Sequence, residues 1–548
     1  MPITQSVDPV TEMPPDIEAT PVAEALPSTA THPVPTALSA TKAPASPAPS
    51  PVPANTAPLP SGGLAGAPGG PATVASLVEA ATRALAEAAD ERGGPLPART
   101  PHQVADAVRE ALGTADGAAG GTARDVLVRL TRVLAAGAAD PAHPHCAAHL
   151  HCPPLAVAVA ADTVASVLNQ SLDSWDQAPA ATAMETQVVA ELADLVGYRG
   201  RDAGGVVTSG GTESNLTALL LARDHALGDA GRRGVARAAD GARPRVLCGR
   251  AAHFSVQRSA ALLGLGEDSV VTVDVDSQHR MRPAALRETL LRLRAEGDLP
   301  VAVVATAGTT DLGGIDPLGA VAHITREFGV WLHVDAAYGG GLLFSRRLRG
   351  LLAGLERADS VSLDLHKLGW QPVAAGILLT RERALFAPLS RSVDYLNPTD
   401  DEEAGYPSLL GYSLRTTRRA DVFKVAVTLR ALGVDGLGRL VDACRDLTLR
   451  TASHVLTEPR LVLAASPALT TVVFRYDAGT HSDTVNARLR RRLLEEGRAV
   501  VGRTRIDGRV WLKLTLLNPD TTPDDTAALL AEVAAAGDAE AAALKESR

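Results

Sequence analysis

The stretch GVVTSGGTESNLTALLLAR (205–223) joins a short apolar run to a Ser-Gly-Gly-Thr turn and then to a helix-forming segment. This order predicts a buried strand that leads into a helix. Gly210 and Gly211 allow a ligand to approach the backbone closely, and the N–H groups of the turn lie at a helix N-terminus, which attracts anions. The stretch lacks the G-x₄-G-K-[ST] spacing of a P-loop. Taken alone, it is compatible with phosphate binding and with a plain glycine turn.

Strands of the same kind alternate with helical segments from about 155 to 390. Strands that are apolar along their whole length are typical of a parallel sheet with both faces covered. This region therefore predicts an α/β domain with helices on both faces of the sheet. Its clearest strands are 205–209, 245–248, 301–308 and 330–335.

The segments on either side of this region differ in composition. Residues 1–72 are rich in Pro, Ala, Thr and Ser, contain no Phe, Tyr or Trp, and predict a disordered tail. Apolar residues at helical spacing in 73–154 predict an N-terminal helical segment. We assign 155–410 to a large domain and 411–548 to a smaller α+β domain. Outside the large domain, we expect a first helix that starts at Thr73 and ends at Gly93. Further helices are expected at 104–112, 126–134, 422–432 and 526–535, and strands at 469–477 and 509–517.

Bulk properties restrict the class of protein. The formal charge of −9 argues against non-specific binding to nucleic acid or to an anionic membrane. Four cysteines in 548 residues do not form a disulfide framework, which favours a reducing compartment. The N-terminus lacks the pattern of a signal peptide, and no apolar span reaches membrane length. We therefore expect a cytoplasmic protein that binds neither nucleic acid nor membranes.

The segment HPHCAAHLHC (143–152) has the composition of a metal site. His145 and His149 are four residues apart and would share one face of a helix. Pro144 and the pair Pro153-Pro154 argue against a continuous helix, however. No second Cys/His cluster elsewhere in the sequence completes a zinc site. We therefore favour a loop or pocket wall over a metal site.

Two further stretches carry ionisable residues next to apolar strands. In VWLHVDAAYGGGLL (330–343), Asp335 ends a strand at the position where open α/β sheets bind ligands. A buried carboxylate needs a partner there, which a cationic ring nitrogen or an Arg would supply equally well. In ADSVSLDLHKLGWQPVAAGILL (358–379), Lys367 follows an apolar run, and partial desolvation of its ammonium suits a Schiff-base lysine. A surface Lys beside a strand is the alternative.

Together, a phosphate cradle, a carboxylate for a ring nitrogen and an amine for an imine are the contacts that pyridoxal phosphate requires. Several longer motifs occur with them, in order along the chain. These motifs are NQSLDSWDQAPAATAME (169–185), TSGGTESNL (208–216), ATAGTTDLGGIDP (305–317), HVDAAYGGG (333–341), SVSLDLHK (360–367), VDYLNP (393–398) and TTRRADVFK (416–424). On these motifs the sequence resembles the group II pyridoxal-phosphate-dependent amino-acid decarboxylases, and among them the bacterial L-2,4-diaminobutyrate decarboxylases and their lysine decarboxylase relatives.

The resemblance runs from about residue 75 to 535 and implies a fold. It implies a fold-type I enzyme with a mainly parallel, seven-stranded sheet, helices on both faces, an N-terminal helical segment and a small C-terminal α+β domain. It also implies that 155–410 binds the pyridoxal phosphate and that the enzyme is a homodimer with shared active sites.

The resemblance also implies roles for the cofactor-binding residues. Lys367 would hold the cofactor through a Schiff base, and Asp335 would pair with the pyridine nitrogen. His253, in AAHFSVQRS (251–259), would stack on the ring. The remaining residues implied are Gly210, Gly211 and Thr212 at the phosphate and Thr306 beside the ring.

Two residues are implied in the reaction itself. His366 would face the reacting carboxylate, and Tyr395 would donate the proton that replaces it. A Phe in place of Tyr395 would suggest oxidative, aldehyde-forming chemistry, so the Tyr favours simple decarboxylation. Asp364 departs from the aromatic and glutamate relatives, which carry Asn there near the phosphate. Because a second anion needs a proton or a partner, we do not carry the phosphate role over to Asp364.

In the family, the segment that matches HCAAHLHCPP (145–154) lines the substrate pocket, so no metal is expected. His151 and the acidic pair Asp173 and Asp176, which would reach in from a neighbouring subunit, would meet a cationic substrate side chain. Such a side chain needs acceptors and carboxylates, whereas an aromatic one does not. Plain packing is the alternative for each of the three.

These residues favour decarboxylation of a small basic amino acid, first L-2,4-diaminobutyrate to 1,3-diaminopropane and CO₂. Lysine or ornithine come next, followed by an aromatic amino acid or glutamate. Transamination or aldehyde formation is a second hypothesis; transaminases bind the substrate carboxylate with an Arg, whereas Arg418 and Arg419 match decarboxylase positions. A non-enzymatic metal-binding or scaffolding protein is the third.

Overall fold

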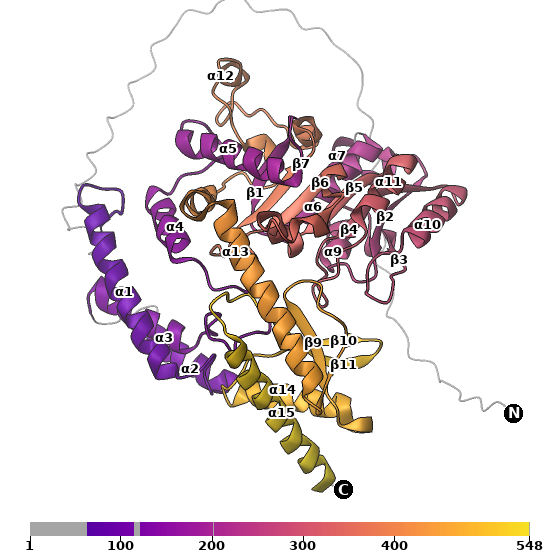
Figure 1. Ribbon diagram of the computed structural model, residues 1–548. Helices are drawn as coiled ribbons and strands as arrows, with labels where there is room; N and C mark the ends of the chain where they lie inside the picture. The colour runs from indigo at the N-terminus through magenta and orange to yellow at the C-terminus, as the bar shows by residue number, and fades with distance from the viewer. Residues whose placement is uncertain (1–62, 114–120, 201, 229, 547–548) are drawn as a thin grey trace, which may run out of the picture. The chain divides into compact units, whose positions relative to one another are not determined.

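The strands of the predicted large domain form one seven-stranded sheet in the order β1-β7-β6-β5-β4-β2-β3. The computed structural model describes residues 63–113, 121–200, 202–228 and 230–546 (Figure 1). Neighbouring strands from β6 to β3 are parallel, and β7 runs antiparallel to both of its neighbours. The prediction of a mainly parallel, seven-stranded sheet is confirmed. The strands are β1 (Gly204–Thr208), β2 (Arg243–Gly249), β3 (Val270–Val273), β4 (Asp298–Thr306), β5 (Trp331–Ala336), β6 (Ser360–Asp364) and β7 (Gly376–Thr380).

Helices cover both faces of this sheet. Because side chains alternate along a strand, the neighbours Val303 and Val304 of β4 enter different hydrophobic clusters, one on each face. Both clusters are completed by helices, as the apolar strands predict. The helices on the Val304 face are α6 (Gly211–Leu227) and α9 (Ser255–Leu262), and those on the Val303 face include α5 (Pro179–Val196), α10 (Pro283–Ala295) and α11 (Leu318–Phe328).

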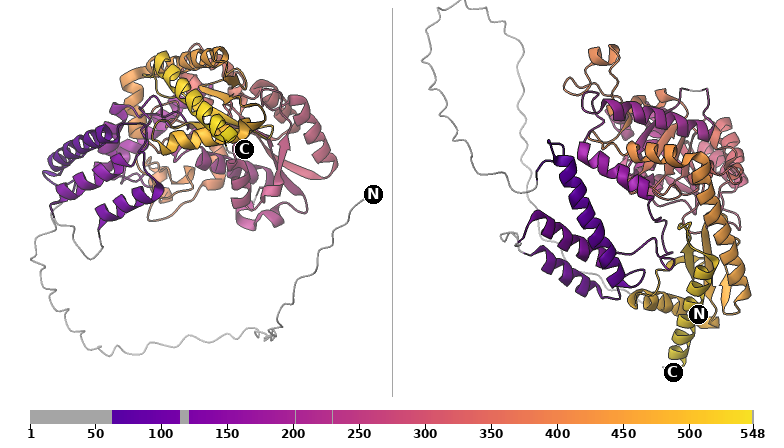
Figure 2. Two further views of the ribbon diagram at one scale, coloured as in Figure 1. Left: turned by 90° about the horizontal axis from the view of Figure 1, so that it is seen from below. Right: turned by 60° about the vertical axis from the view of Figure 1, so that its left-hand side comes forward.

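Three helices form the N-terminal part of the described chain, as the apolar spacing predicts. α1 (Gly70–Arg92) packs against α3 (Ala123–Ala136), and α2 (Pro101–Leu112) also contacts α3 (Figure 2). α1 begins three residues before the predicted start at Thr73, because proline suits the first turn of a helix and one lies at position 71. The helix ends at a glycine in the left-handed conformation, as predicted. Residues 1–62 of the predicted tail lie outside the described residues.

The C-terminal part contains a second, four-stranded antiparallel sheet. The long helix α13 (Val422–Thr457) contributes side chains to the hydrophobic clusters beside both sheets (Figure 1). The last helix, α15 (Pro523–Glu546), continues past its predicted end at Ala535, because most of the residues beyond are Ala, Glu, Leu and Lys, which are strong helix formers. The other elements of this part are β8 (Leu461–Leu463), β9 (Thr471–Tyr476), β10 (Gly502–Ile506), β11 (Arg509–Thr515) and α14 (Ser482–Glu495).

All described residues belong to one unit of contacts that runs from Leu59 to Arg548. The predicted domain boundaries inside it therefore stay predictions. Among the described helices, none has both the length and the apolar character needed to cross a bilayer. The remaining helices are α4 (Ala156–Leu168), α7 (Ala230–Arg233), α8 (Val235–Ala238) and α12 (Thr399–Glu403), and the short 3₁₀ turns are Glu267–Ser269, Gly339–Phe344, Arg349–Leu352, Leu355–Arg357, Arg383–Leu389, Leu410–Tyr412 and Gly479–His481.

Candidate active site

A pocket of about 320 Å³ lies at the carboxyl ends of β4, β5 and β6. Open α/β sheets hold ligands at this edge, and the volume is in the range of small-molecule sites. The fold thus brings the three chemistry-bearing stretches of the sequence to one place. The predicted site residues in the pocket wall are Gly210, Gly211, Thr212, His253, Thr306, Asp335, His366 and Lys367.

The N-terminus of α6 forms one wall of the pocket. A Cβ on Gly210 would lie 3.2 Å from the ring of His366, and one on Gly211 would lie 3.2 Å from Oδ2 of Asp364. A side chain at either glycine would therefore crowd the neighbouring wall of the pocket at the start of the helix. The first N–H groups of the helix have no partner within it, so the turn suits an anion such as phosphate.

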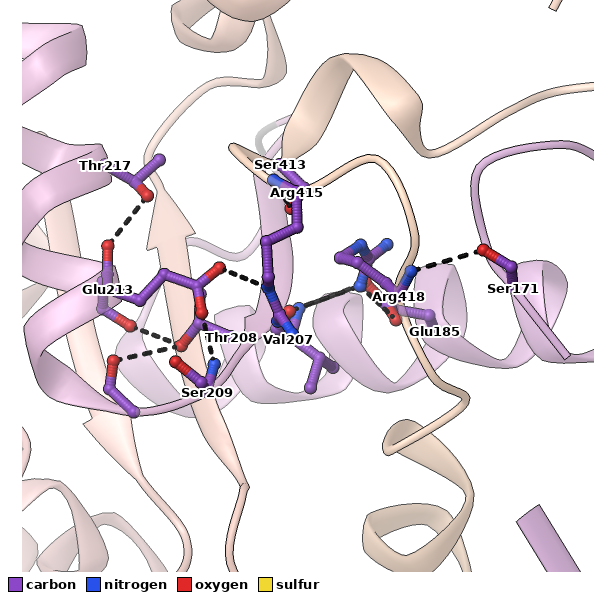
Figure 3. Close-up of polar contacts among 12 residues, drawn as sticks. Ser171, Glu185, Val207, Thr208, Ser209, Glu213, Thr217, Ser413, Arg415 and Arg418 are labelled. Carbon is purple, nitrogen blue, oxygen red and sulfur yellow. Dashed lines mark hydrogen bonds and ion pairs between the residues drawn. The ribbon is translucent and has the colours of Figure 1, made fainter. Parts of the chain in front are cut away.

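Glu213, in the first turn of α6, is held by two contacts (Figure 3). Its Oε1 accepts a hydrogen bond from Nε of Arg415 at 2.9 Å, and its Oε2 accepts one from the Ser209 N–H at 2.7 Å. The ion pair offsets the repulsion that a lone carboxylate would exert on an anion in the pocket. The contact with Ser209 also holds the turn in shape.

Asp335 lies one residue before the end of β5 and is 6% exposed. Its carboxylate accepts hydrogen bonds from Nδ2 of Asn215 at 2.8 Å, from the Ala337 N–H at 3.1 Å and from Oγ of Ser362 at 3.3 Å. Within the described residues no Arg or Lys pairs with Asp335, so the alternative of an Arg partner is not realised. The three neutral donors satisfy the carboxylate oxygens without compensating their charge, which suits a cationic ring nitrogen as the partner.

Lys367 lies in the turn after β6, where its ammonium contacts the acidic residue that departs from the family pattern. Nζ of Lys367 is 3.1 Å from Oδ2 of Asp364, and Nε2 of His366 is 3.6 Å from the same oxygen. Lys367 thereby supplies the partner that Asp364 was expected to need. Burial lowers the pKa of His366, which the carboxylate of Asp364 opposes only in part, so this imidazole is neutral at pH 7.

His253 lies between β2 and α9, next to the ring of Phe254, whose centroid is 4.3 Å away. Its Nδ1 is 2.8 Å from Oγ of Ser255. Burial lowers the pKa of His253, and the charge of Asp335 opposes this. His253 is therefore a second neutral imidazole in the pocket.

A buried ion pair supports the strand that leads into the α6 turn (Figure 3). Nη1 of Arg418 donates to both carboxylate oxygens of Glu185, at 2.8 and 3.0 Å, and the two side chains are 2% and 1% exposed. Glu185 also accepts the Val207 N–H at 3.1 Å, and Arg418 contacts the Val207 carbonyl at 3.3 Å. The pair therefore anchors β1 just before the glycine turn.

Four predicted residues do not line this pocket within one chain. Tyr395 is 81% exposed and lines a separate hollow together with Asp176. Asp173 is buried and accepts a hydrogen bond from Gln177 at 3.0 Å. His151 is exposed. Their predicted roles stay predictions.

The His/Cys segment forms turns and one backbone bridge, between Cys146 and Val500, and no helix, as its prolines predict. Leu150 lines the pocket, and Sγ of Cys152 donates to the His366 carbonyl at 3.2 Å. Within the part of the chain that the structure describes, no group of three His, Cys, Asp or Glu side chains is arranged to hold a metal ion.

The residues of the pocket fit pyridoxal phosphate. An anion cradle, an ionised acceptor and a lysine amine face one cavity of suitable size. One buried polar atom in its wall, Oδ1 of Asp364, has no hydrogen-bond partner among the described residues. Buried polar atoms are rarely left unpaired, so a ligand that reaches it is expected.

Comparison with known proteins leads to the same group. Residues 112–477 match the model of the pyridoxal-dependent decarboxylase conserved domain. The chain belongs to this family. It is 49% identical to the L-2,4-diaminobutyrate decarboxylase of Rhizobium meliloti (strain 1021), over 70% of this chain and 75% of that protein. It is 39% identical to the enzyme of the same name from Acinetobacter baumannii, over 72% and 80% of the two chains.

The fold comparison agrees with this family. The glutamate decarboxylase domain of the diaminobutyrate-pyruvate transaminase and L-2,4-diaminobutyrate decarboxylase from Vibrio parahaemolyticus superposes with a TM-score of 0.77, at 36% identity, over 86% of this chain and 96% of that one. As a member of the pyridoxal-dependent decarboxylase family, the chain is an amino-acid decarboxylase that uses pyridoxal phosphate.

Sequence reasoning missed the polar residues beneath the pocket. Asn215, His333 and Ser362 are buried and hydrogen-bonded to one another or to Asp335. The signal that could have revealed them is a polar residue at every second position of two apolar strands, in WLHVD and SVSLD. Alternation places such residues on one face of the sheet.

We predict that His333 makes stability depend on pH. Burial lowers its pKa from 6.5 to about 4, so only the unfolded chain takes up this proton as the pH falls from 6.5 to about 4. Stability is therefore lost across that window, by about 2 kcal/mol between pH 7 and pH 5. Urea unfolding at pH 7 and pH 5 measures the loss in the free energy of unfolding. This loss should be about 2 kcal/mol smaller for His333→Gln than for the wild type. An equal loss in both proteins would contradict the prediction.

Proposed function

We propose that the enzyme converts L-2,4-diaminobutyrate to 1,3-diaminopropane and CO₂. The two relatives at 49% and 39% identity that carry this activity in their names support the substrate. One observation carries the reaction type: Lys367, Asp335 and the N-terminus of α6 line a single pocket. Lysine or ornithine are the next candidates, and an aromatic amino acid or glutamate would need a different side-chain pocket.

The contacts of two arginines favour decarboxylation over transamination. A transaminase of this fold needs a free Arg for the substrate α-carboxylate. Arg418 is buried and paired with Glu185, and Arg419 lies 2.7 Å from both Asp162 and Asp421. Removing either guanidinium from its partners would leave a carboxylate unpaired. Neither Arg is therefore free to bind the carboxylate of the substrate.

Bound pyridoxal phosphate supplies a ring that accepts the electron pair of the breaking bond between Cα and the carboxylate. We propose that Lys367 provides the amine that holds it and that Asp335 keeps its ring nitrogen protonated. The hydrogen-bond donors on Asp335 make this charge preorganised, which is a large source of catalysis. His253 would cover the ring. The remaining binding residues proposed are Gly210, Gly211 and Thr212 for the phosphate and Thr306 for the ring.

His366 and Tyr395 are proposed to act on the substrate. His366, neutral through burial, faces the carboxylate and helps to hold its bond to Cα perpendicular to the ring. After CO₂ has left, Tyr395 donates a proton to Cα, so that a C–H bond replaces the C–C bond. The high exposure of Tyr395 is compatible with a residue that reaches a site from outside.

We propose a homodimer in which each subunit completes the site of the other. Tyr395 and Asp176 line one hollow, separate from the pocket that contains Lys367. Docking of that surface over the pocket of a partner would deliver a proton donor and a carboxylate together. His151, Asp173 and Asp176 would then meet the distal ammonium of the substrate, which needs acceptors and negative charge.

Two broader proposals complete this account. The cysteine content supports a cytoplasmic location. The chain is proposed to divide into a tail (1–72), a helical segment (73–154), a cofactor-binding domain (155–410) and a small α+β domain (411–548).

The first test is a substrate panel. With pyridoxal phosphate added, we expect CO₂ and 1,3-diaminopropane from L-2,4-diaminobutyrate, and little product from ornithine, lysine, glutamate or an aromatic amino acid. Lys367→Ala should abolish turnover, because the change removes the amine that is proposed to hold the cofactor. CO₂ release and amine chromatography measure both. A longer diamine or an aromatic amine as the main product would contradict the substrate, and a keto acid or aldehyde would contradict the reaction type.

Replacement of Tyr395 by Phe removes only the phenolic proton. Tyr395→Phe should lower diamine formation at least about 100-fold, in line with the loss of a general acid, while the cofactor dissociation constant stays unchanged. Product analysis in air should also show aldehyde. Unchanged diamine formation in the variant would exclude Tyr395 as the proton donor.

Shared sites can be tested by complementation. Lys367→Ala and Tyr395→Phe chains are inactive alone, but half of randomly mixed dimers contain both. Each mixed dimer would hold one intact site, so co-expression should restore about a quarter of wild-type activity. If the mixture is as inactive as its parents, Lys367 and Tyr395 act within one chain.

A further inference from the structure

One face of β5 and β6 carries an unbroken row of polar side chains beneath the pocket. His333 pairs in register with Ser360, and Asp335 pairs with Ser362 on the neighbouring strand. Asn215, on α6, hydrogen-bonds to residues of both strands. All five side chains are at most 6% exposed. Polar groups at this depth are stable only if each donor faces an acceptor, so their hydrogen bonds have a defined direction.

The amide of Asn215 is the branch point of this row. Its Nδ2 donates to Oδ2 of Asp335 at 2.8 Å and to Oγ of Ser255 at 2.9 Å. Its Oδ1 accepts from Nε2 of His333 at 2.9 Å, and it lies 3.1 Å from Oγ of Ser362, whose single proton it shares with Asp335. The ionised carboxylate only accepts, so it requires the nitrogen of the amide, and the oxygen must then face His333.

The orientation of the Asn215 amide determines the hydrogen bonds on the side away from the pocket, which we call the far branch. Because Asn215 presents an oxygen, Nε2 of His333 carries the ring proton. Burial keeps the imidazole neutral, with a pKa of about 4, so its Nδ1 is bare. Oγ of Ser360 lies 2.9 Å from that Nδ1 and donates to it, while accepting the indole N–H of Trp331 at 3.0 Å. The branch ends there with its donors and acceptors paired.

The near branch leads back to the pocket. Oγ of Ser255 accepts one proton from Asn215, so its own proton is free to go to Nδ1 of His253, 2.8 Å away. The Ser255 N–H also points to that Nδ1, at 3.3 Å. With two donors on Nδ1, His253 carries its proton on Nε2.

We propose that Asn215 is a positioning residue that holds Asp335 as an acceptor and fixes His253 as the Nε2–H tautomer, with His333 locking the orientation of its amide. The inference rests on the proposed function, which puts Asp335 and His253 against the cofactor ring. One amide thus couples the charge at the ring nitrogen to the tautomer of the imidazole that covers the ring. We call the hydrogen bonds that run from His333 through Asn215 to Asp335, Ser255 and His253 the relay. The relay depends on the polarity of these side chains as well as on their volume.

Asn215→Asp replaces the donor NH₂ group of the amide by an acceptor oxygen and leaves the volume of the side chain almost unchanged. The variant offers Ser255 an acceptor, so the hydroxyl of Ser255 turns to it and becomes an acceptor for His253. We expect His253 to change from the Nε2–H to the Nδ1–H tautomer. We also expect the dissociation constant of pyridoxal phosphate to rise at least about tenfold, because a second carboxylate faces Asp335. ¹⁵N NMR of histidine-labelled holoenzyme reports the tautomer, with His253→Gln to assign the signal.

Matched variants separate this role from packing. Thr217→Val, two residues along α6, removes a buried hydroxyl whose one hydrogen bond among the described residues goes to the Glu213 carbonyl, and should change neither quantity. His333→Gln offers an amide N–H to Asn215 and an oxygen to Ser360, so it should keep cofactor affinity within about twofold. His333→Leu removes both groups and should weaken binding about tenfold.

Failure of the relay can be distinguished from failure of the proposed function. If Asn215→Asp leaves the tautomer of His253 and the cofactor dissociation constant unchanged, or if Thr217→Val alters them equally, the relay is refuted. If the wild type releases no CO₂ from any amino acid while the tautomer and affinity changes occur as expected, the relay stands and the proposed function fails.

Discussion

Asp335 holds a carboxylate at 6% exposure between apolar strands, where an ionised group is stable only if its oxygens receive hydrogen bonds. The donors come from α6, from β6 and from the backbone that follows β5. Each of these elements is thereby fixed relative to the strand end. The glycine turn of α6 and the turn with Lys367 are carried by α6 and β6, so the geometry of the pocket follows from how this one group is accommodated.

The wall of the pocket formed by the glycine turn has to accommodate negative charges next to an anion site. The turn suits an anion, yet Glu213 and Asp364 bring two carboxylates to the pocket wall. Arg415 pairs with Glu213, and Lys367 pairs with Asp364, so neither negative charge is left alone. The second pair has a consequence for catalysis, because Lys367 is also the proposed cofactor amine. Asp364 is then the group that receives this ammonium whenever the amine is not engaged with the cofactor.

Local patterns in the sequence were sufficient for much of the fold. Strand and helix periodicities predicted the mainly parallel sheet and its covering helices, because alternation and helical spacing depend on neighbours along the chain. The ends of elements were less well predicted: α1 starts before Thr73 and α15 continues past Ala535. The antiparallel direction of β7 was also not visible, because a strand carries no local record of the direction in which its neighbours run.

For the site, the sequence by itself determined which chemical groups are present: a glycine turn at a helix start, an acid at a strand end and a lysine beyond the next strand. It did not determine their partners. Asn215 and Asp335 are 120 positions apart, and only the packing of α6 against the sheet brings them to 2.8 Å. The same holds for Tyr395, whose solvent-exposed position in the single chain depends on how a distant loop packs. Residue types are local, whereas hydrogen-bond partners, burial and charge pairing depend on distances that the tertiary structure alone decides.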